Sequence, residues 1–558
     1  MAFLFLSPIR GIPYIYGAVS YRREDNGMPT RKSVCLGKID LKTRLPIFND
    51  KYLPWLKDHN LTTEEAFKDY ISKTNNKYNI NLDYLNKKEN LEINEKNFSI
   101  DELRKSPSKC FGTLYLFNYI IKKICLYIIL YSIFPDLYEQ IITLVYFYII
   151  EADPAMYCRF FALKYDTYID ADKVSSQRIS ELLSKISYYQ KIEFYERWGN
   201  LIKEKEYLAL DSTSISTYSN NMPEAKFGHN KQGDNLKQVN LCLLFGEESG
   251  LPVFSTTYDG SLNDVRTLIN VLKRSSLIQN LNYKLVLDRG YYSKKNLLFM
   301  IESKFKHKFI ISIPATTNLK YELIDKNINI IDNINYYINY NDELLYGTTQ
   351  RIKWENHYLY AHIFNDYNKI HNYRPQIIND INSLYSLALE DPESFLKLEE
   401  YKNYIIIKKN NKYNIYKVLK NQDAYSKALL REGWFVFLSN SIKDTQDALK
   451  IYRKRDVIEK AFDICKNHTE QARLRVHNSL KMENKIFIGF LSLIITSQIH
   501  KVMFEKFLYR KYTMKELFAE LDLIQVTRIK KYSILTPLSK NQINIYSAFD
   551  CPLPQEDL

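Results

Sequence analysis

Residues 452–466 read YRKRDVIEKAFDICK, and four side chains in this stretch decide how the chain can be interpreted. Tyr452, Arg455, Glu459 and Lys466 are separated from the first of them by 3, 7 and 14 positions. On a single α-helix, expected over about 445–467, these offsets fall within about 60° of one another. One face would carry a ring, two cations and one carboxylate, and the apolar residues of the other side would dock on a core. A lone acid beside phosphate-seeking groups suggests a metal ligand next to a polyanion.

Two other acids follow short apolar runs. Asp211 comes after residues 207–210, and Asp288 after residues 285–287, so each stands where a buried strand would end. Either could simply be a turn residue. Together with Glu459, however, they form three carboxylates that can converge on one site. Oxygen ligands of this kind suit Mg²⁺, and two such ions about 4 Å apart can serve phosphoryl transfer.

These blocks resemble the DDE transposases of bacterial insertion sequences, in the subgroup with a Tyr-Arg-Glu-Lys signature around the third acid. The resemblance rests on LALDST at 208–213, LDRGY at 287–291 and the stretch 452–466. Weaker similarities are GHNK at 228–231, GSLND at 260–264 and LRVH at 474–477. The spacing of three acids alone would be weak evidence. The four identities of the last block make the resemblance specific over roughly half of the chain.

The resemblance implies an α/β fold with a ribonuclease H-like catalytic core, in which a mixed five-stranded sheet is covered by helices. It implies that Asp211, Asp288 and Glu459 are both the catalytic and the metal-binding residues. The cofactor would be two Mg²⁺ ions, for which Mn²⁺ can substitute. Tyr452, Arg455 and Lys466 would face the DNA backbone near the cleavage point, where a ring stacks on a nucleotide and Arg forks a phosphate.

The activity implied is cleavage of the ends of an insertion sequence and their joining to target DNA. The partners would be double-stranded terminal inverted repeats and target DNA, bound by a homodimer or a higher assembly, because two ends must meet one target. Two alternatives stay open. A metal-dependent nuclease could use the same fold without strand transfer, and a domesticated copy could bind DNA without catalysis.

Composition agrees with a large globular protein that binds a polyanion. The 558 residues are 46% hydrophobic, and the formal net charge is +14. An excess of positive charge favours nucleic acid, although an AT-rich genome also produces Lys-rich sequences. Seven scattered cysteines without zinc-type spacing indicate reduced thiols in a cytoplasmic protein. The resemblance implies a bacterial protein associated with the nucleoid. The apolar runs within residues 111–150 are about 10 residues long, which predicts buried helices rather than membrane spans.

The order of predicted elements divides the chain into segments. An Asn-Gly turn at residues 26–27 between alternating runs predicts a basic hairpin over 12–39. This hairpin could touch DNA or merely be solvated. Polar residues 41–105 predict a linker with short helices, and the later tail one helix followed by irregular chain. The predicted parts are 1–105 with possible DNA binding, a helical domain at 106–204, the catalytic domain at 205–315 and 431–478, an inserted β-containing subdomain at 316–430, and a helical region at 479–558.

Within the catalytic domain, three strands come first and then alternate with helices, which is the order typical of a ribonuclease H-like domain. The predicted strands lie at 206–211, 238–246, 251–258, 283–288 and 307–313, with helices at 264–275 and 294–304. A strand at 434–439 returns the chain to the core, and residues 480–506 form a strongly apolar helix.

Several polar residues have a structural as well as a functional interpretation. Tyr452 could be a half-buried interface residue. His229 and Lys231 could line the rim of the active site or belong to an ordinary loop. For His477, a structural role is favoured over phosphate binding. Asp463 lies near the signature face, but Glu459 fits the four-residue pattern and Asp463 does not.

Overall fold

The computed structural model separates the chain into two compact units, Met1–Ser106 and Pro107–Leu558. The finer division of the chain predicted from the sequence stays a prediction. The residues that the structure describes are 2–9, 12–22, 29–39, 46–59, 106–202, 207–228, 233–279, 283–341, 343–396, 403–410, 415–468, 473–529 and 532–555. The predicted turn at 26–27, residues 60–105 of the linker predicted at 41–105, and His229 and Lys231 lie outside them.

The first unit contains a four-stranded antiparallel sheet. The predicted hairpin is present as β2 (Ile12–Arg22) paired with β3 (Pro29–Ile39). The apolar N-terminal residues add β1 (Ala2–Ile9) to one side, and β4 (Pro46–Phe48) adds to the other. Helix α1 (Tyr52–Asp58) supplies Trp55, which packs with Leu36 on this sheet. The hairpin is therefore part of a small domain with its own core.

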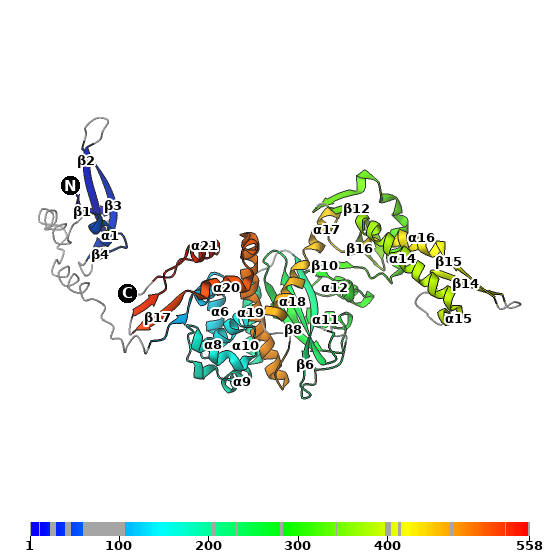
Figure 1. Ribbon diagram of the computed structural model, residues 1–558, viewed down its shortest axis with the longest axis horizontal. Helices are drawn as coiled ribbons and strands as arrows, with labels where there is room; N and C mark the ends of the chain where they lie inside the picture. Colours follow the sequence, from blue (N-terminus) through cyan, green and yellow to red (C-terminus); the bar gives the residue numbers. More distant parts are fainter. Residues whose placement is uncertain are drawn as a thin grey trace. The chain divides into compact units, whose positions relative to one another are not determined.

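The second unit begins with the predicted helical region (Figure 1). Its interior is almost entirely aliphatic and aromatic, and the long helix α19 (Ser479–Glu505) runs through it. The helices are α5 (Gly112–Lys123), α6 (Leu126–Ile133), α7 (Tyr138–Ile150), α8 (Cys158–Lys164), α9 (Ser176–Lys185) and α10 (Tyr188–Ile202), with short turns η2 (Ala155–Tyr157) and η3 (Ala171–Val174).

A single mixed sheet forms the centre of the second unit. It has nine strands in the order β11-β12-β13-β16-β10-β9-β6-β7-β8, rather than the five expected. Only β6–β9 and β9–β10 pair in parallel. The five predicted strands are β6 (Tyr207–Thr217), β7 (Lys237–Gly246), β8 (Pro252–Asp259), β9 (Lys284–Leu287) and β10 (Lys308–Ser312), and the two predicted helices are α11 (Asp264–Gln279) and α12 (Lys294–Glu302).

The extra strands come from the predicted insertion. Strands β11 (Tyr337–Tyr340), β12 (Glu343–Trp354) and β13 (His357–Asp366) extend the central sheet, because β13 pairs with the returning strand β16 (Trp434–Ser439). The insertion is therefore only partly a separate subdomain. Its outer part has a core of its own. That part consists of α14 (Tyr367–Glu390), α15 (Pro392–Phe395), β14 (Ile405–Asn410), β15 (Ile415–Lys420) and α16 (Gln422–Arg431), and a short helix α13 (Asn318–Lys326) precedes β11.

The predicted signature helix is two helices. α17 (Thr445–Arg453) ends before Arg455, and α18 (Asp456–His468) begins after it. At the break, the amides of Arg455 and Ile458 donate to carbonyl groups three residues earlier, which tightens the turn. The two helices also pack differently, because Leu449 of α17 lies in one apolar cluster and Ile458 in another. The expectation of one continuous helical face across residues 452–466 is wrong.

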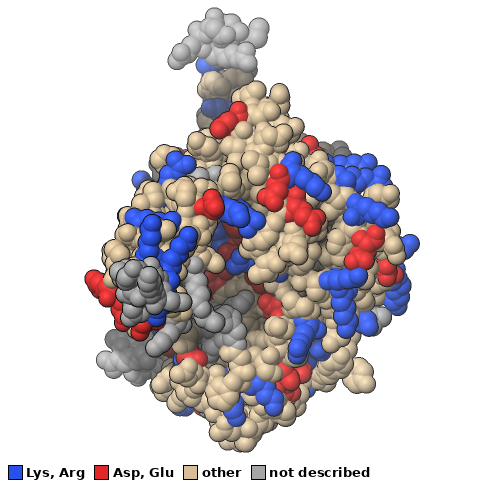
Figure 2. Space-filling view, turned by 90° about the vertical axis from the view of Figure 1, so that its right-hand side faces the viewer, with Lys and Arg blue, Asp and Glu red and all other residues tan. Residues whose placement is uncertain are grey.

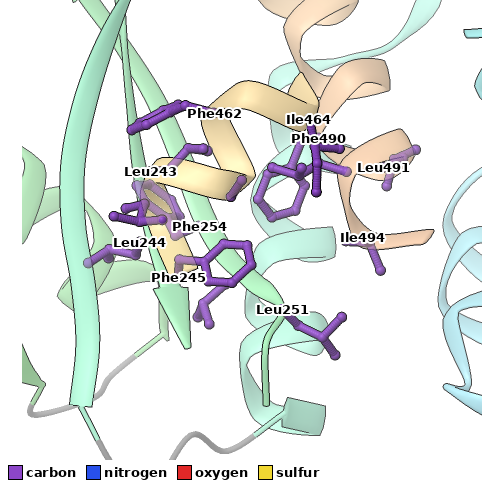
Figure 3. Packing of buried hydrophobic residues seen from close by; sticks show 14 of the residues in the cluster. Leu243, Leu244, Phe245, Leu251, Phe254, Phe462, Ile464, Phe490, Leu491 and Ile494 are labelled. Carbon is purple, nitrogen blue, oxygen red and sulfur yellow. The ribbon is translucent and has the colours of Figure 1, made fainter. Parts of the chain in front are cut away.

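Helix α18 is held between the sheet and α19. Phe462 and Ile464 point toward Leu243 of β7 on one side and toward Phe490 of α19 on the other, as Figure 3 shows. All four side chains are buried. Burial of each such side chain contributes about 1.5–3 kcal/mol. The apolar half of the predicted helix therefore does dock on the core, and it fixes where Glu459 emerges.

The tail and the apolar helices differ from expectation in one respect. Beyond α20 (Met514–Asp522), the tail forms strands β17 (Gln525–Ile529) and β18 (Tyr532–Leu535) and a further helix, α21 (Lys540–Ala548).

Among the described residues, α19 alone is by itself long and apolar enough to cross a membrane, and two bent helix pairs would pass the same test as single spans. In this fold, 78% of the apolar window of α19 is buried inside the protein. The described cysteines are free thiols.

Candidate catalytic site

The two aspartates lie side by side on the central sheet. Strand β6 continues past Asp211, so this residue lies within the strand rather than at its end. Leu210 pairs in parallel register with Leu287, and each aspartate is the next residue in the chain after its leucine. Neighbouring strands are about 4.8 Å apart, so the register alone places both carboxylates at one position of the sheet. That the two aspartates bind metal stays a prediction.

The local sequence explains how β6 holds Asp211 in place. Residues 207–217 are almost all buried, and Asp211 is the one partly exposed position among them. Its own carboxylate accepts a hydrogen bond of 2.7 Å from the amide of Ser212. The Ser212 hydroxyl donates to the carboxylate of Asp264, the first residue of α11, and the Tyr258 hydroxyl donates to the same oxygen at 2.8 Å. Asp264, which is not one of the three predicted acids, thus fixes β6 from its other face.

Arg455 connects the acids. Its guanidinium lies 3.5 Å from a carboxylate oxygen of Asp211 and 2.6 Å from one of Glu459. Burial lowers the pKa of Arg455, but the nearby Tyr452 and the three carboxylates outweigh this effect and raise the pKa overall. Asp288 is among those carboxylates. Two of the predicted acids, Asp211 and Glu459, therefore contact one cation at the break between α17 and α18, and the charge of Asp288 also acts on it.

The donor set fits a divalent cation in its chemistry. Three carboxylates supply hard oxygen atoms, and the negative potential they create is already satisfied in part by a positive group. Among the described residues, however, no group of three His, Cys, Asp or Glu side chains is close enough together to hold one ion. The Glu459 side chain is 56% exposed and directed to Arg455. It would have to turn toward the aspartates to share an ion with them.

The comparisons with known proteins identify the family. The family model described as "Transposase DDE domain" matches residues 202–495, which is more than half of the chain. The chain belongs to the DDE transposase family. No curated protein matches it significantly. A solved structure, the piggyBac transposase synaptic complex with hairpin DNA, is similar with a TM-score of 0.34 and 9% identity over 68% of each chain, too little to support an argument.

The signature tyrosine of this transposase is an interface residue in the described structure. The Tyr452 ring stacks on Phe437 with centroids 3.8 Å apart, and Arg455 lies 5.9 Å from its centroid. Burial raises the pKa of Tyr452 to about 12, and the charge of Asp288 adds to this effect. The phenol therefore stays protonated at neutral pH. Stacking on Phe437 matches the structural interpretation, and contact with Arg455 still places the ring at the edge of the acidic site.

The remaining predicted residues are placed only in part. Lys466 lies in α18, but its side chain is outside the described residues. Asp463 is exposed on α18. His477 is exposed in the segment before α19. The structure therefore brings Asp211, Asp288, Glu459, Arg455 and Tyr452 together, and it leaves the position of the Lys466 ammonium undescribed.

A pocket of about 250 Å³ adjoins the acids and contains residues that the sequence did not single out. Phe435 and Phe437 of β16 line it, together with Tyr452 and Arg455. Lys369 and Arg453 add two more cations, and each lies within about 6 Å of the Phe435 ring centroid. The aromatic residues at alternate positions of β16 were a sequence signal for this aromatic wall. Lys369 comes from the insertion and is far from the other pocket residues in the sequence, so the sequence did not indicate it.

The face of the transposase that carries the insertion is rich in Lys and Arg, and it is hollowed near its centre (Figure 2). Acidic side chains are visible inside this hollow. The Lys and Arg side chains of this face would attract a polyanion, and the acidic side chains in the recess would attract cations.

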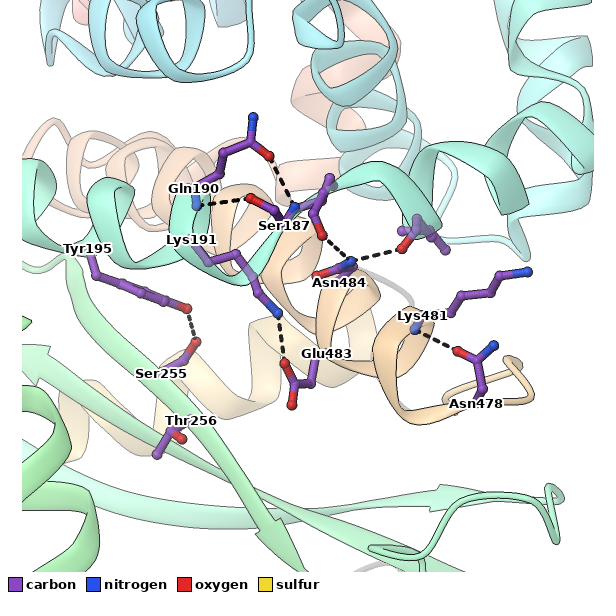
Figure 4. A network of polar contacts seen from close by, with 12 residues as sticks. Ser187, Gln190, Lys191, Tyr195, Ser255, Thr256, Asn478, Lys481, Glu483 and Asn484 are labelled. Atoms are coloured by element: carbon purple, nitrogen blue, oxygen red, sulfur yellow. Dashed lines mark hydrogen bonds and ion pairs between the residues drawn. The ribbon is translucent and has the colours of Figure 1, made fainter.

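A second polar network joins the helical region to the sheet. The Lys191 ammonium of α10 lies 2.8 Å from Glu483 of α19, and Tyr195 and Ser255 share a hydrogen bond of 2.6 Å (Figure 4). The Lys191 side chain is only 9% exposed. These contacts tie α10 to β8 and α19, so the helical region supports the sheet that carries the aspartates.

Proposed function

We propose that this DDE transposase cleaves the ends of an insertion sequence and joins them to target DNA by two-metal phosphoryl transfer. The observation that carries the proposal is that Arg455 contacts both Asp211 and Glu459, while the register of β6 and β9 places Asp288 beside Asp211. The mixed sheet, with its parallel β6 and β9, supports a ribonuclease H-like core. The residues of the Tyr-Arg-Glu-Lys signature support membership of that subgroup.

In this proposal, Asp211, Asp288 and Glu459 hold two Mg²⁺ ions, or Mn²⁺ in their place. When bound, the ions supply an activated oxygen nucleophile and stabilise the leaving oxygen. Glu459 is the mobile member of the set, because it is exposed and its present partner is Arg455. Once Arg455 is released from the acids, its planar fork can bind a DNA phosphate in two-point fashion. The salt bridges therefore hold the Arg455 side chain next to the proposed position of the reacting phosphate.

The remaining groups of the site would position the DNA strand. Tyr452 cannot act as a base near neutral pH, because its pKa is raised to about 12 by burial. Its ring and that of Phe437 line the adjoining pocket together with Arg455. Lys369 and Arg453 supply positive charge beside the Phe435 ring of the same pocket, and Lys466 is proposed to do so further along α18. The uncharged aromatic rings and the fixed cations together orient a phosphodiester of the DNA strand.

The partners proposed are the double-stranded terminal repeats of the element and the target DNA. The formal charge of +14 supports a polyanionic partner. The basic hairpin of the first unit is proposed to contribute to end recognition. A homodimer or higher assembly on two ends is proposed from the chemistry of joining them to one target. The protein is proposed to act in the bacterial cytoplasm at the nucleoid.

The proposal is tested with the variants Asp211→Asn, Asp288→Asn and Glu459→Gln and a DNA fragment that carries the element ends. Each variant should lose cleavage and joining in Mg²⁺ while binding the fragment with unchanged affinity. Asp463→Asn is the matched control, because it removes an exposed acid from the same helix as Glu459. Cleavage by any of the three variants at the rate of this control removes that acid from the site.

The same assay separates the alternatives. A nuclease would release cut ends without joined products, and an inactive DNA-binding copy would yield neither product while still retaining the fragment. Joined products formed by the wild-type protein and not by the three variants would establish transposition.

A further inference from the structure

Strands β14 and β15 form a two-stranded antiparallel ribbon in the outer part of the insertion (Figure 1). Helix α14 packs against both strands, and Ile405 and Val418 are buried on that side of the ribbon. Side chains alternate between the two faces of a strand, so Ile406 and Leu419 point to the other side. These two residues pair across the ribbon, and each is 37% exposed. The ribbon therefore has one face on a core and one face in solvent.

The solvent face of the ribbon, which consists of Ile406, Lys408, Lys417 and Leu419, carries two lysines in direct opposition. Lys408 and Lys417 are partners in the strand register, and both are exposed. Like charges that lie directly opposite each other destabilise a strand pair. Among the residues that the structure describes, no acid pairs with either lysine. The solvent face thus keeps a repulsive pair that an anionic partner would relieve.

The lysines on the core side of the same ribbon do have partners. The Lys420 ammonium donates a hydrogen bond of 2.5 Å to the Asn382 side chain of α14. The Lys409 ammonium lies 3.9 Å from a carboxylate oxygen of Glu393 in α15. Each lysine of this face therefore has a role in holding the ribbon on its helices. The two lysines of the solvent face have no such role, which distinguishes them from ordinary structural residues.

The dimensions of the ribbon match the major groove of DNA. Paired strands are about 4.8 Å apart, and the groove is about 12 Å wide and about 8.5 Å deep, which admits a two-stranded β-ribbon. Cations at the edges of such a ribbon reach phosphates, and apolar side chains can contact the methyl group of thymine. Residues 401–422 contain six Lys and no Asp or Glu, so no carboxylate of this segment would repel a phosphate. Both the charge and the apolar pair of the solvent face fit this partner.

We propose that the solvent face of β14 and β15 docks in the major groove of duplex DNA. Lys408 and Lys417 each contact one phosphate, and Ile406 and Leu419 contact thymine methyl groups. The inference rests on the proposed function, because it takes DNA as the partner, but it assigns a contact surface outside the site at Asp211. This surface favours A·T base pairs, since thymine alone presents a methyl group in the groove.

The first test measures how DNA affinity depends on salt, in EDTA so that binding is separated from cleavage. Full-length wild-type protein, Lys408→Gln/Lys417→Gln and Lys409→Gln/Lys420→Gln are titrated against a fluorescein-labelled duplex of about 30 base pairs at about 50 to 200 mM KCl. The last variant is the matched control, because it removes two lysines from the core side of the same ribbon. Each phosphate contact contributes about 0.9 to the slope of log K against log salt, so wild type and control should lose about 12-fold more affinity than the solvent-face variant over this range.

The second test asks whether the ribbon lies in the major groove. Two duplexes composed only of A·T pairs are compared, one with thymine and one with uracil, which lacks the methyl group. Burial of one methyl group corresponds to about a fourfold gain in affinity, so wild type should bind the thymine duplex at least about fourfold more tightly. Ile406→Ser/Leu419→Ser should bind the two duplexes equally.

The outcomes of the two tests are separable. Equal salt slopes for the solvent-face variant and the control, with normal circular-dichroism melts, overturn the inference and leave the proposed cleavage intact. Equal binding of the thymine and uracil duplexes by wild type overturns the docking in the groove. Binding to phosphatidylglycerol vesicles that depends on Lys408 and Lys417, with unchanged DNA slopes, would assign the surface to a membrane instead. Absence of duplex binding by wild type overturns both this inference and the proposed function.

A conservative variant guards against a folding defect. Lys408→Arg/Lys417→Arg keeps both charges and should keep the wild-type slope, whereas the single variant Lys408→Gln should lower the slope by about 0.9. A reduced slope in the Arg variant would show that charge at these two positions is not what binds the duplex.

Discussion

Replacement of Arg455 by Met should destabilise the transposase when no divalent metal is present, and Mg²⁺ should reverse the effect. Arg455 and Asp211 are each 14% exposed in their side chains, and their charged atoms are 3.5 Å apart. At an effective dielectric constant of about 20, two unit charges at this distance attract by about 5 kcal/mol. Desolvation offsets part of this energy, and the exposed Glu459 contributes little. We therefore expect a net loss of about 2–3 kcal/mol.

Mg²⁺ should compensate because it can replace the missing positive charge among the three carboxylates. A ligand at 100 times its dissociation constant stabilises the folded state by about 2.7 kcal/mol, which matches the expected loss. Differential scanning fluorimetry in EDTA and in saturating Mg²⁺ measures both effects. The matched control is Arg453→Met, because Arg453 pairs with Glu343 at 3.1 Å but is 31% exposed and lies on the other side of the helix break.

The control should lose at most about 1 kcal/mol and should gain no extra stability from Mg²⁺ beyond that of wild type. If Arg455→Met melts with the control in EDTA, the acids are not coupled through this guanidinium. If Mg²⁺ stabilises all three proteins equally, the carboxylates around Arg455 are not the metal ligands.

Three further perturbations have expected outcomes. Burial lowers the pKa of both His307 and His362 to about 4. Each neutral imidazole therefore contributes stability that is complete above pH 6.5 and is lost as the pH falls toward 4. Urea unfolding midpoints should fall over this pH window, and His362→Gln should flatten their pH dependence. Tyr452→Phe should keep the stacking on Phe437 and melt like wild type, whereas Tyr452→Ala should cost about 2 kcal/mol by leaving a cavity, and equal melting of the two would exclude this packing role. Gly260→Ala would place a methyl group 2.0 Å from the carbonyl oxygen of Gln238, so soluble expression and melting temperature should both fall, and an unchanged melt would show that the loop is free to move.

The sequence by itself determined the elements that depend on local pattern. The runs before Asp211 and Asp288 predicted buried strands, and the run 434–439 predicted β16 with its observed bounds. Alternating or continuous apolar residues report burial directly, so such strands can be recognised without knowledge of their neighbours. The three acids and the signature residues were also proposed at this level, from their residue types and spacing together with the resemblance to DDE transposases.

Only the tertiary structure decided how these pieces meet. The apolar pattern of residues 445–467 does not reveal that Leu449 and Ile458 belong to different clusters, and that difference accompanies the break that places Arg455 between Asp211 and Glu459. Strands β11–β13 join the central sheet because β13 pairs with β16, across about 70 residues of chain. Pairing partners and helix breaks depend on contacts between distant residues, which no local pattern encodes.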